Sequence, residues 1–152
     1  MQKSSQDPPT PISLGSFLPY QVTLLANQIA RYTTSVAKRH GGLNLSHWRV
    51  LAAIADRPGR SANQVVAVTP MDKGIVSRAV RSLIDQRLVA RKASQEDGRV
   101  GHLHLTAKGR RRYDAIAAEV RAFDQQLRSN LSSTEQEQLL RLLTRLTSAV
   151  IT

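Results

Sequence analysis

The sequence lacks cysteine and has few aromatic residues. None of its 152 residues is cysteine, and only 4% are Phe, Trp or Tyr. The absence of cysteine excludes disulfides, thiolate zinc sites, a cysteine nucleophile and thiol-based sensing of oxidants. Because 41% of the residues are hydrophobic, the chain still has enough apolar material to bury a core. That core must consist mostly of Leu, Val, Ile and Ala, and the length predicts a single domain.

Long apolar runs and acidic residues are also scarce. No stretch approaches the roughly 18 apolar residues that would span a membrane, and no secretion signal is visible. The sequence therefore predicts a cytoplasmic protein that does not enter a membrane. Basic residues number 22 against 11 acidic ones, which gives a net charge of +11. An arginine-rich proteome would produce the same composition, so charge alone only favours an anionic partner.

The positive charge is concentrated in one part of the chain. Residues 61–112 hold eleven basic and four acidic side chains, whereas residues 113–152 hold four and five. A basic middle segment is typical of nucleic-acid binding, and a neutral, apolar-periodic end is typical of a protein–protein surface. The polar residues 1–13, with three prolines, predict a disordered arm before a domain at 14–152.

Apolar spacing and capping residues predict six helices and one hairpin. The first helix follows a stripe from Leu18 to Val36 and stops at Gly41. Ser46 is the predicted cap of the second helix. Ser61 with Gln64 predicts a capping box for the third.

The second half of the chain continues this pattern. Thr69 and Pro70 predict the start of a helix at 70–86 that buries Val76, Val80, Leu83 and Ile84. Residues 88–92 and 101–105 predict the two strands of a hairpin. Two further helices are predicted to begin at Thr106 and Ser132.

The predicted order indicates a mainly α fold with a small β-hairpin wing. Helices joined by a short turn and followed by a hairpin form a winged helix-turn-helix, here residues 46–106. Residues 14–45 and 107–152 carry three long apolar stripes that so small a lobe cannot cover. We therefore predict that they form a helical dimerisation region and that the protein is a homodimer.

The helix at 70–86 is the predicted reading element. Its apolar face suits the core, and its opposite face offers cations and a hydroxyl that reach base edges in a major groove. Basic residues on the hairpin suit phosphate or the minor groove. The residues predicted to contact DNA are Ser61, Lys73, Gly74, Ser77, Arg78, Arg81, Arg91, Lys92, Asp97 and Arg99.

Four segments resemble the MarR/SlyA family of bacterial regulators. They are residues 45–51 (LSHWRVL), 71–78 (MDKGIVSR), 97–99 (DGR) and 103–109 (LHLTAKG), in the family's order and spacing. The resemblance implies a homodimer that binds pseudo-palindromic operators, usually as a repressor. Members often release DNA when a small phenol or aromatic carboxylate binds. By position, Ser77, Arg78 and Arg81 match recognition-helix contacts, and Asp97 and Arg99 match the wing pair.

An effector site is predicted where the dimerisation helices meet the winged lobe. Histidine, arginine and aromatic rings suit a planar aromatic anion, because arginine pairs its carboxylate and the rings stack. The predicted residues are Tyr20, Arg31, Tyr32, His40, His47, Trp48 and Arg49. The alternatives stay open that Trp48 belongs to the core, that His47 only starts a helix and that Arg49 is solvated.

Other functions find less support. His102 and His104 share a strand face, but no third ligand is evident, so we predict no metal and no bound cofactor. No catalytic constellation or phosphate loop is visible, so we do not expect an enzyme. The main alternative is a non-specific, architectural DNA-binding protein without an effector. The sequence does not identify the operator, the regulated genes, the effector or the sign of regulation.

Overall fold

The computed structural model describes residues 10–93 and 101–150, which form six helices and a two-stranded hairpin. The first four helices are α1 (Leu18–Arg39), α2 (Leu45–Asp56), α3 (Ala62–Val68) and α4 (Lys73–Asp85). The hairpin strands are β1 (Val89–Ala93) and β2 (Gly101–Leu105), and α5 (Ala107–Arg128) and α6 (Ser133–Val150) follow. This order confirms the predicted mainly α fold with a small β-hairpin wing.

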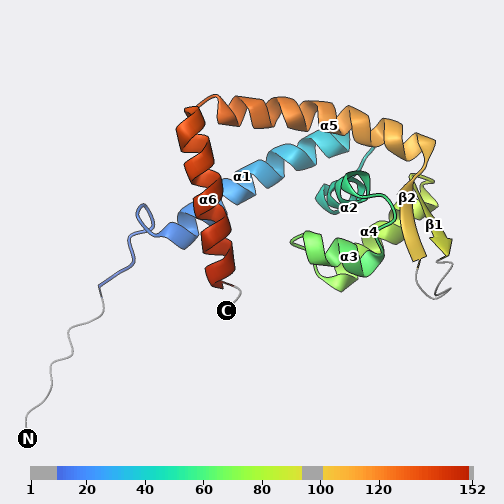
Figure 1. Cartoon of the computed structure of the whole chain (residues 1–152), viewed down its shortest axis with the longest axis horizontal. Helices are drawn as coiled ribbons and strands as arrows, with labels where there is room; N and C mark the ends of the chain where they lie inside the picture. Colours follow the sequence, from blue (N-terminus) through green and yellow to red (C-terminus); the bar gives the residue numbers. More distant parts are fainter. Residues whose placement is uncertain (1–9, 94–100, 151–152) are drawn as a thin grey trace, which may run out of the picture.

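The molecule consists of a compact lobe and an extended helical part. Figure 1 shows α2, α3, α4 and the hairpin gathered in the lobe, with α1 and α5 running out of it. The rings of Tyr32 on α1 and Phe123 on α5 stack with centroids 3.9 Å apart, so these two helices pack directly. At the far end α6 turns back across the start of α1.

The buried core belongs to the lobe and the adjoining parts of α1 and α5. Its largest fully buried side chains are Leu43, Leu51, Ile54, Leu83, Leu88, Leu103 and Ile116. No residue of α6 is buried. The core is therefore built from Leu, Ile and Val, as the scarcity of aromatic residues requires, and the extended part leaves apolar surface uncovered.

Two helix ends show how local sequence sets the boundaries. Gly41 and Gly42 follow α1 with φ of 113° and 70°, backbone angles that residues other than glycine rarely adopt. The predicted cap of α2 was wrong, because the cap is Asn44 and not Ser46. The Asn44 side chain accepts a hydrogen bond from the His47 N–H (2.9 Å), and the His47 ring accepts one from the Asn44 N–H (3.2 Å). Histidine here fills the position that glutamate or glutamine usually takes in a capping box.

The hairpin is short and antiparallel. Val89 pairs with Leu105 and Ala93 with Gly101, so β1 runs one residue later than predicted. Thr106 caps α5 by accepting from the Gly109 N–H (2.9 Å), and Ser132 and Glu135 form the predicted capping box of α6.

Part of the predicted chain organisation lies outside the described residues. This applies to residues 1–9 of the predicted arm and to 94–100 between the strands. The boundaries at 14, 46 and 107 stay predictions. No helix in the described part of the chain is both long and apolar enough to cross a membrane.

Candidate nucleic-acid interface

Helix α4 separates an apolar face from a basic one. Val76, Ala79, Val80 and Leu83 are buried against the lobe. Ile84 is half-buried and packs against this core, and Ala79 is buried as well. The opposite face is exposed and consists of Lys73, Gly74, Ser77, Arg78 and Arg81. A helix with one buried face and one cationic face can enter a major groove without losing its packing.

The start of α4 differs from the prediction. Its cap is Asp72, whose carboxylate accepts a hydrogen bond from the Ile75 N–H (2.7 Å). Thr69 instead ends α3, and its hydroxyl donates to the Val65 carbonyl (2.8 Å). The predicted helix thus began three residues early, because Thr69-Pro70 and Asp72 are both plausible starts in the sequence. Met71, between the two candidates, is buried.

Gly74 has a local reason to be glycine. A Cβ added at this position would lie 3.2 Å from the Asp72 carboxylate and 3.5 Å from the Arg78 guanidinium. The Arg78 side chain therefore folds back over Gly74, one turn earlier on the same face.

Ser61 lies at the start of α3, and its hydroxyl accepts from the Gln64 N–H (3.2 Å) in the predicted capping box. Ser61 is half-exposed at this position. Its structural role as a cap is thus established, and a contact to DNA stays a prediction.

The wing presents two of its four predicted contacts. Arg91 and Lys92 are exposed on β1. Asp97 and Arg99 lie outside the described residues. Gly101, on the facing strand, makes room for Arg91, because a Cβ there would lie 2.5 Å from the Arg91 Cδ. Sequence reasoning missed this role, since only the strand register places Gly101 beside Arg91.

A second group of residues fixes the hairpin to the lobe. The Leu103 N–H donates to the Arg60 carbonyl (3.0 Å), and the Gly59 N–H donates to the Leu103 carbonyl (2.9 Å). His102 Nδ1 donates to the Gly59 carbonyl (2.7 Å). The Arg60 side chain donates to the Ala53 carbonyl at the end of α2. The wing is therefore fixed relative to α2, and His102 serves that attachment.

The predicted effector residues do not surround one cavity in the single chain. Tyr32 stacks on Phe123 and Trp48 on Tyr113, the latter pair with centroids 5.6 Å apart. Both Tyr32 and Trp48 pack against the hydrophobic core. The aromatic partners come from α5, about 65 to 90 residues later in the chain, a distance over which sequence spacing carries no signal.

The other predicted effector residues are spread over three helix regions. His40 pairs with Glu119 of α5, and Arg31 lies on the exposed side of α1. Tyr20 is exposed near the start of α1, and Arg49 is half-exposed on α2. Nothing in the described structure brings these four side chains together.

His47 is the predicted effector residue that lies closest to the reading helix. It lines a cavity of about 390 Å³ together with Ser46, Ile75, Arg78 and Ser82. Burial lowers the pKa of His47 below its ordinary value, because it disfavours the protonated ring. One predicted effector residue and one predicted DNA contact thus share a cavity between α2 and α4.

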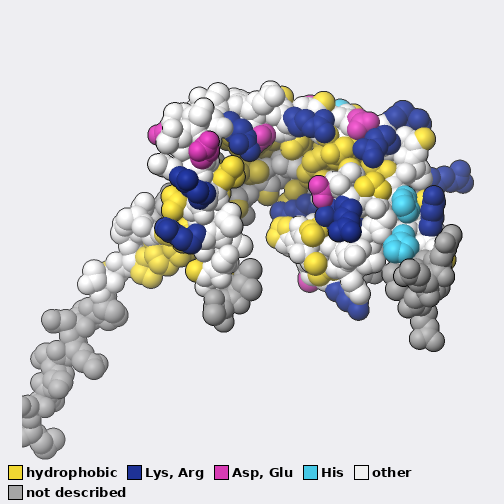
Figure 2. Space-filling view, viewed as in Figure 1, with side chains coloured by type: hydrophobic (Ala, Val, Ile, Leu, Met, Phe, Trp, Pro, Cys, Tyr) yellow, Lys and Arg dark blue, Asp and Glu magenta, His cyan; other side chains and the backbone are white. Residues whose placement is uncertain are grey.

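Apolar side chains gather on the helices outside the lobe. Leu139, Leu142, Leu143 and Leu146 of α6 are each 40–45% exposed, and Leu18 and Val22 of α1 are 53% and 44% exposed. Four of them, Leu18, Val22, Leu143 and Leu146, line an apolar cleft where α6 crosses α1. Figure 2 shows yellow apolar surface in this region, with dark blue basic side chains beside it.

The described residues contain no obvious metal centre. Within residues 10–93 and 101–150 no three His, Asp or Glu side chains are placed to hold a metal ion.

Comparisons with known proteins identify the family. A model described as the MarR family matches residues 41–100. The HTH-type transcriptional repressor Mb2911 of Mycobacterium bovis is 30% identical over 120 residues, which cover 79% of this chain and 86% of that protein.

Solved structures share the fold over almost the whole chain. A MarR/EmrR family regulator from Acinetobacter sp. ADP1 superposes with a TM-score of 0.83 at 23% identity, covering 91% of this chain and 98% of that one. CouR from Rhodococcus jostii RHA1, crystallised with p-coumaroyl-CoA, gives a TM-score of 0.79 at 20% identity, covering 88% and 94%. The chain therefore belongs to the MarR family of winged-helix transcriptional regulators, which bind DNA and are not enzymes.

Proposed function

We propose that this protein is a sequence-specific, ligand-responsive repressor that binds a pseudo-palindromic operator as a homodimer in the cytoplasm. The observation that carries the proposal is the exposed face of α4, where Lys73, Ser77, Arg78 and Arg81 stand opposite a fully packed core face. Arginine can bind a guanine edge with two hydrogen bonds, which discriminates sequence, whereas lysine and serine suit phosphate and less specific contacts.

The uncovered apolar surface supports the homodimer. Helix α6 buries none of its residues within one chain, although its Leu143 and Leu146 line a cleft with α1. A second copy would cover this surface and set two α4 helices about 34 Å apart, one turn of B-DNA. Such spacing fits two half-sites of a palindrome.

The cavity between α2 and α4 supports a response to a small ligand. A planar phenol or aromatic acid bound there would contact Arg78 and compete with DNA for its guanidinium, so ligand and operator would favour different states. CouR, a structural neighbour, binds the phenolic thioester p-coumaroyl-CoA. We propose a ligand of the phenolic or aromatic carboxylate class for this chain as well.

The test of the repressor role is a mobility-shift assay on DNA from upstream of the protein's own gene. We expect binding to that DNA at least about 10³-fold tighter than to a scrambled duplex at the same salt concentration. Equal affinity for both duplexes would instead support the architectural alternative.

The test of the ligand site compares two variants of α2. Ser46→Leu fills the cavity beside Arg78 and should blunt release of the operator by p-coumaric acid or its CoA thioester, whereas Arg49→Ala, outside this cavity, should not. The opposite result would place the effector at the junction of α1 and α2, as the sequence suggested. If neither compound releases the operator from the unaltered protein, the ligand class is wrong.

A further inference from the structure

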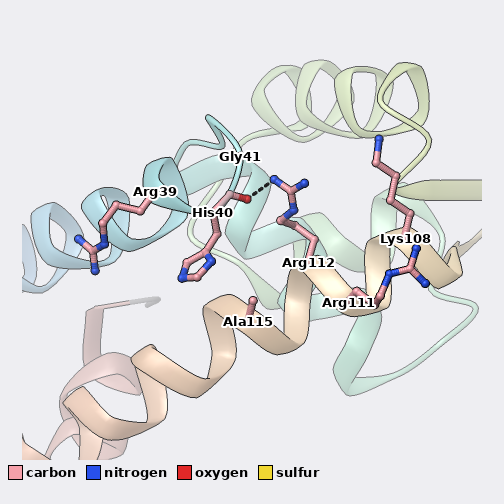
Figure 3. Close-up of a pocket in the computed structure, with 7 residues that line it drawn as sticks. All are labelled: Arg39, His40, Gly41, Lys108, Arg111, Arg112 and Ala115. Carbon is pink, nitrogen blue, oxygen red and sulfur yellow. Dashed lines mark hydrogen bonds between the residues drawn. The ribbon is translucent and has the colours of Figure 1, made fainter.

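A second basic site lies away from the reading helix. A cavity of about 320 Å³ opens between the end of α1 and the first turns of α5. Arg39, His40, Lys108, Arg111 and Arg112 line it, and none of its seven lining residues is acidic (Figure 3). Its volume is at the lower end of the range typical of small-molecule sites.

Three of these cations occupy one face of α5. Lys108, Arg111 and Arg112 are three and four residues apart, a spacing that brings side chains together on a helix. Figure 3 shows Arg112 pointing toward His40, and Lys108 and Arg111 nearer the start of α5, with the Lys108 side chain extending away from Arg111. Like charges at this spacing destabilise a helix, so their proximity has a cost that a bound anion would remove.

Structural contacts account for only part of this charge. Arg112 donates to the His40 carbonyl, and Lys108 Nζ donates to the Gln86 carbonyl at the end of α4 (3.1 Å). Each of these side chains keeps further donors, because an ammonium has three and a guanidinium five. Arg111 makes no hydrogen bond or ion pair to any other described residue. Arg39 forms an ion pair with Glu119 of α5, so its charge is balanced within the chain. Contacts within the chain therefore account for Arg39, Arg112 and Lys108 but not for Arg111.

We propose that this cavity binds a soluble anion that carries a pyrophosphate group. Guanidinium groups bind phosphate oxygens in pairs, and two or more negative charges are needed to balance Lys108, Arg111 and Arg112. Apart from the His40 ring, the lining offers no aromatic side chain, and Ala115 is its largest apolar side chain. The cavity is thus unsuited to the aromatic ligand proposed above, and the two sites are separate.

The position of the cavity argues against the operator as its ligand. Lys108 contacts the C-terminal end of α4, whereas the predicted base contacts start at the N-terminal end, and 13 helical residues span about 20 Å. The cavity also adjoins the end of the hairpin where β2 meets α5, opposite the Gly101 end. A duplex on the reading face of α4 would not reach it.

The proposal is tested by calorimetric titration of the full-length protein with inorganic pyrophosphate, at constant ionic strength and without DNA. We expect saturable binding that Arg111→Gln weakens about tenfold, the loss typical of one charged hydrogen bond. The matched control is Arg121→Gln, which removes the same charge from an exposed position of α5 and should change the affinity less than about twofold. Circular dichroism establishes that both variants fold.

The outcomes separate a built site from general electrostatics. Absence of saturable binding, or equal weakening by both variants, would overturn the proposal. A third measurement repeats the titration on the protein saturated with duplex DNA. Unchanged pyrophosphate affinity supports a site for a free anion, whereas competition by DNA together with weaker DNA binding by Arg111→Gln would assign the cavity to the nucleic-acid backbone and overturn it. Because the first titration contains no DNA, its result is independent of the proposed operator binding.

Discussion

Replacing Arg78 separates base reading from general attraction to DNA. Arg78 lies on the exposed face of α4 and folds over Gly74, so its truncation to alanine removes no core contact. Lys92, exposed on β1, is the matched control, because it also carries one positive charge but is predicted to contact phosphate. We expect the two substitutions to change DNA binding in different ways.

The size of the effect follows from the contact that each side chain makes. One bidentate arginine–guanine contact is worth about 1–3 kcal/mol of discrimination. A dimer has two copies of Arg78, so Arg78→Ala should reduce the ratio of specific to non-specific affinity by about 2–6 kcal/mol, or roughly 30-fold or more. Lys92→Ala should weaken binding to both duplexes equally and reduce the slope of log K against log salt by about 2 for the dimer.

Fluorescence anisotropy with labelled operator and scrambled duplexes, at several salt concentrations, measures both quantities. Equal losses on the two duplexes for Arg78→Ala would refute its role in base reading. A selective loss on the operator for Lys92→Ala would show that the division of roles between α4 and the wing is wrong.

Three further predictions concern the stability and assembly of the chain. Burial lowers the pKa of His47, and its neutral ring accepts the capping hydrogen bond from the Asn44 N–H. The contribution of His47 to the free energy of unfolding should therefore be fully present above its ordinary pKa of 6.5 and be lost as the pH falls below that value. His47→Gln, which keeps the capping box without titrating, should flatten the dependence of Tm on pH between 7.5 and 5.5; an unchanged slope would contradict this assignment. Gly109→Ala places a Cβ against the backbone carbonyl of Leu88. The clash should cost about 2–3 kcal/mol, more than the roughly 1 kcal/mol gained in helix propensity, and should lower Tm by several degrees. The control Gly15→Ala, where a Cβ meets nothing, should leave Tm unchanged. Leu146→Glu should shift the dimer toward single chains in sedimentation velocity, and an unaltered dimer would exclude the cleft between α1 and α6 as the interface.

The sequence predicts the order of elements well because the signals are local. Apolar spacing finds each helix, and the capping residues Ser61, Thr106 and Ser132 mark the starts that the structure shows. Two starts were misplaced where two capping residues compete. The structure has Asn44 as the cap and not Ser46, and Asp72 and not Thr69, and each observed cap accepts a hydrogen bond from the backbone N–H three residues later.

The site was predicted less completely than the fold. The basic face of α4 follows from helical periodicity alone, so its residues were found. The stacking of Tyr32 on Phe123 joins residues 91 positions apart and has no local signature. The same holds for Gly101 beside Arg91 and for the cluster around Arg111, which becomes a site only when α1 and α5 come together.

The number of chains in the complex with DNA tests the central claim most directly. Native mass spectrometry of the protein with a duplex from upstream of its gene should show two chains on one duplex, and the free protein should be a dimer at micromolar concentration. One chain per duplex, or a free protein that stays a single chain at that concentration, would contradict the account.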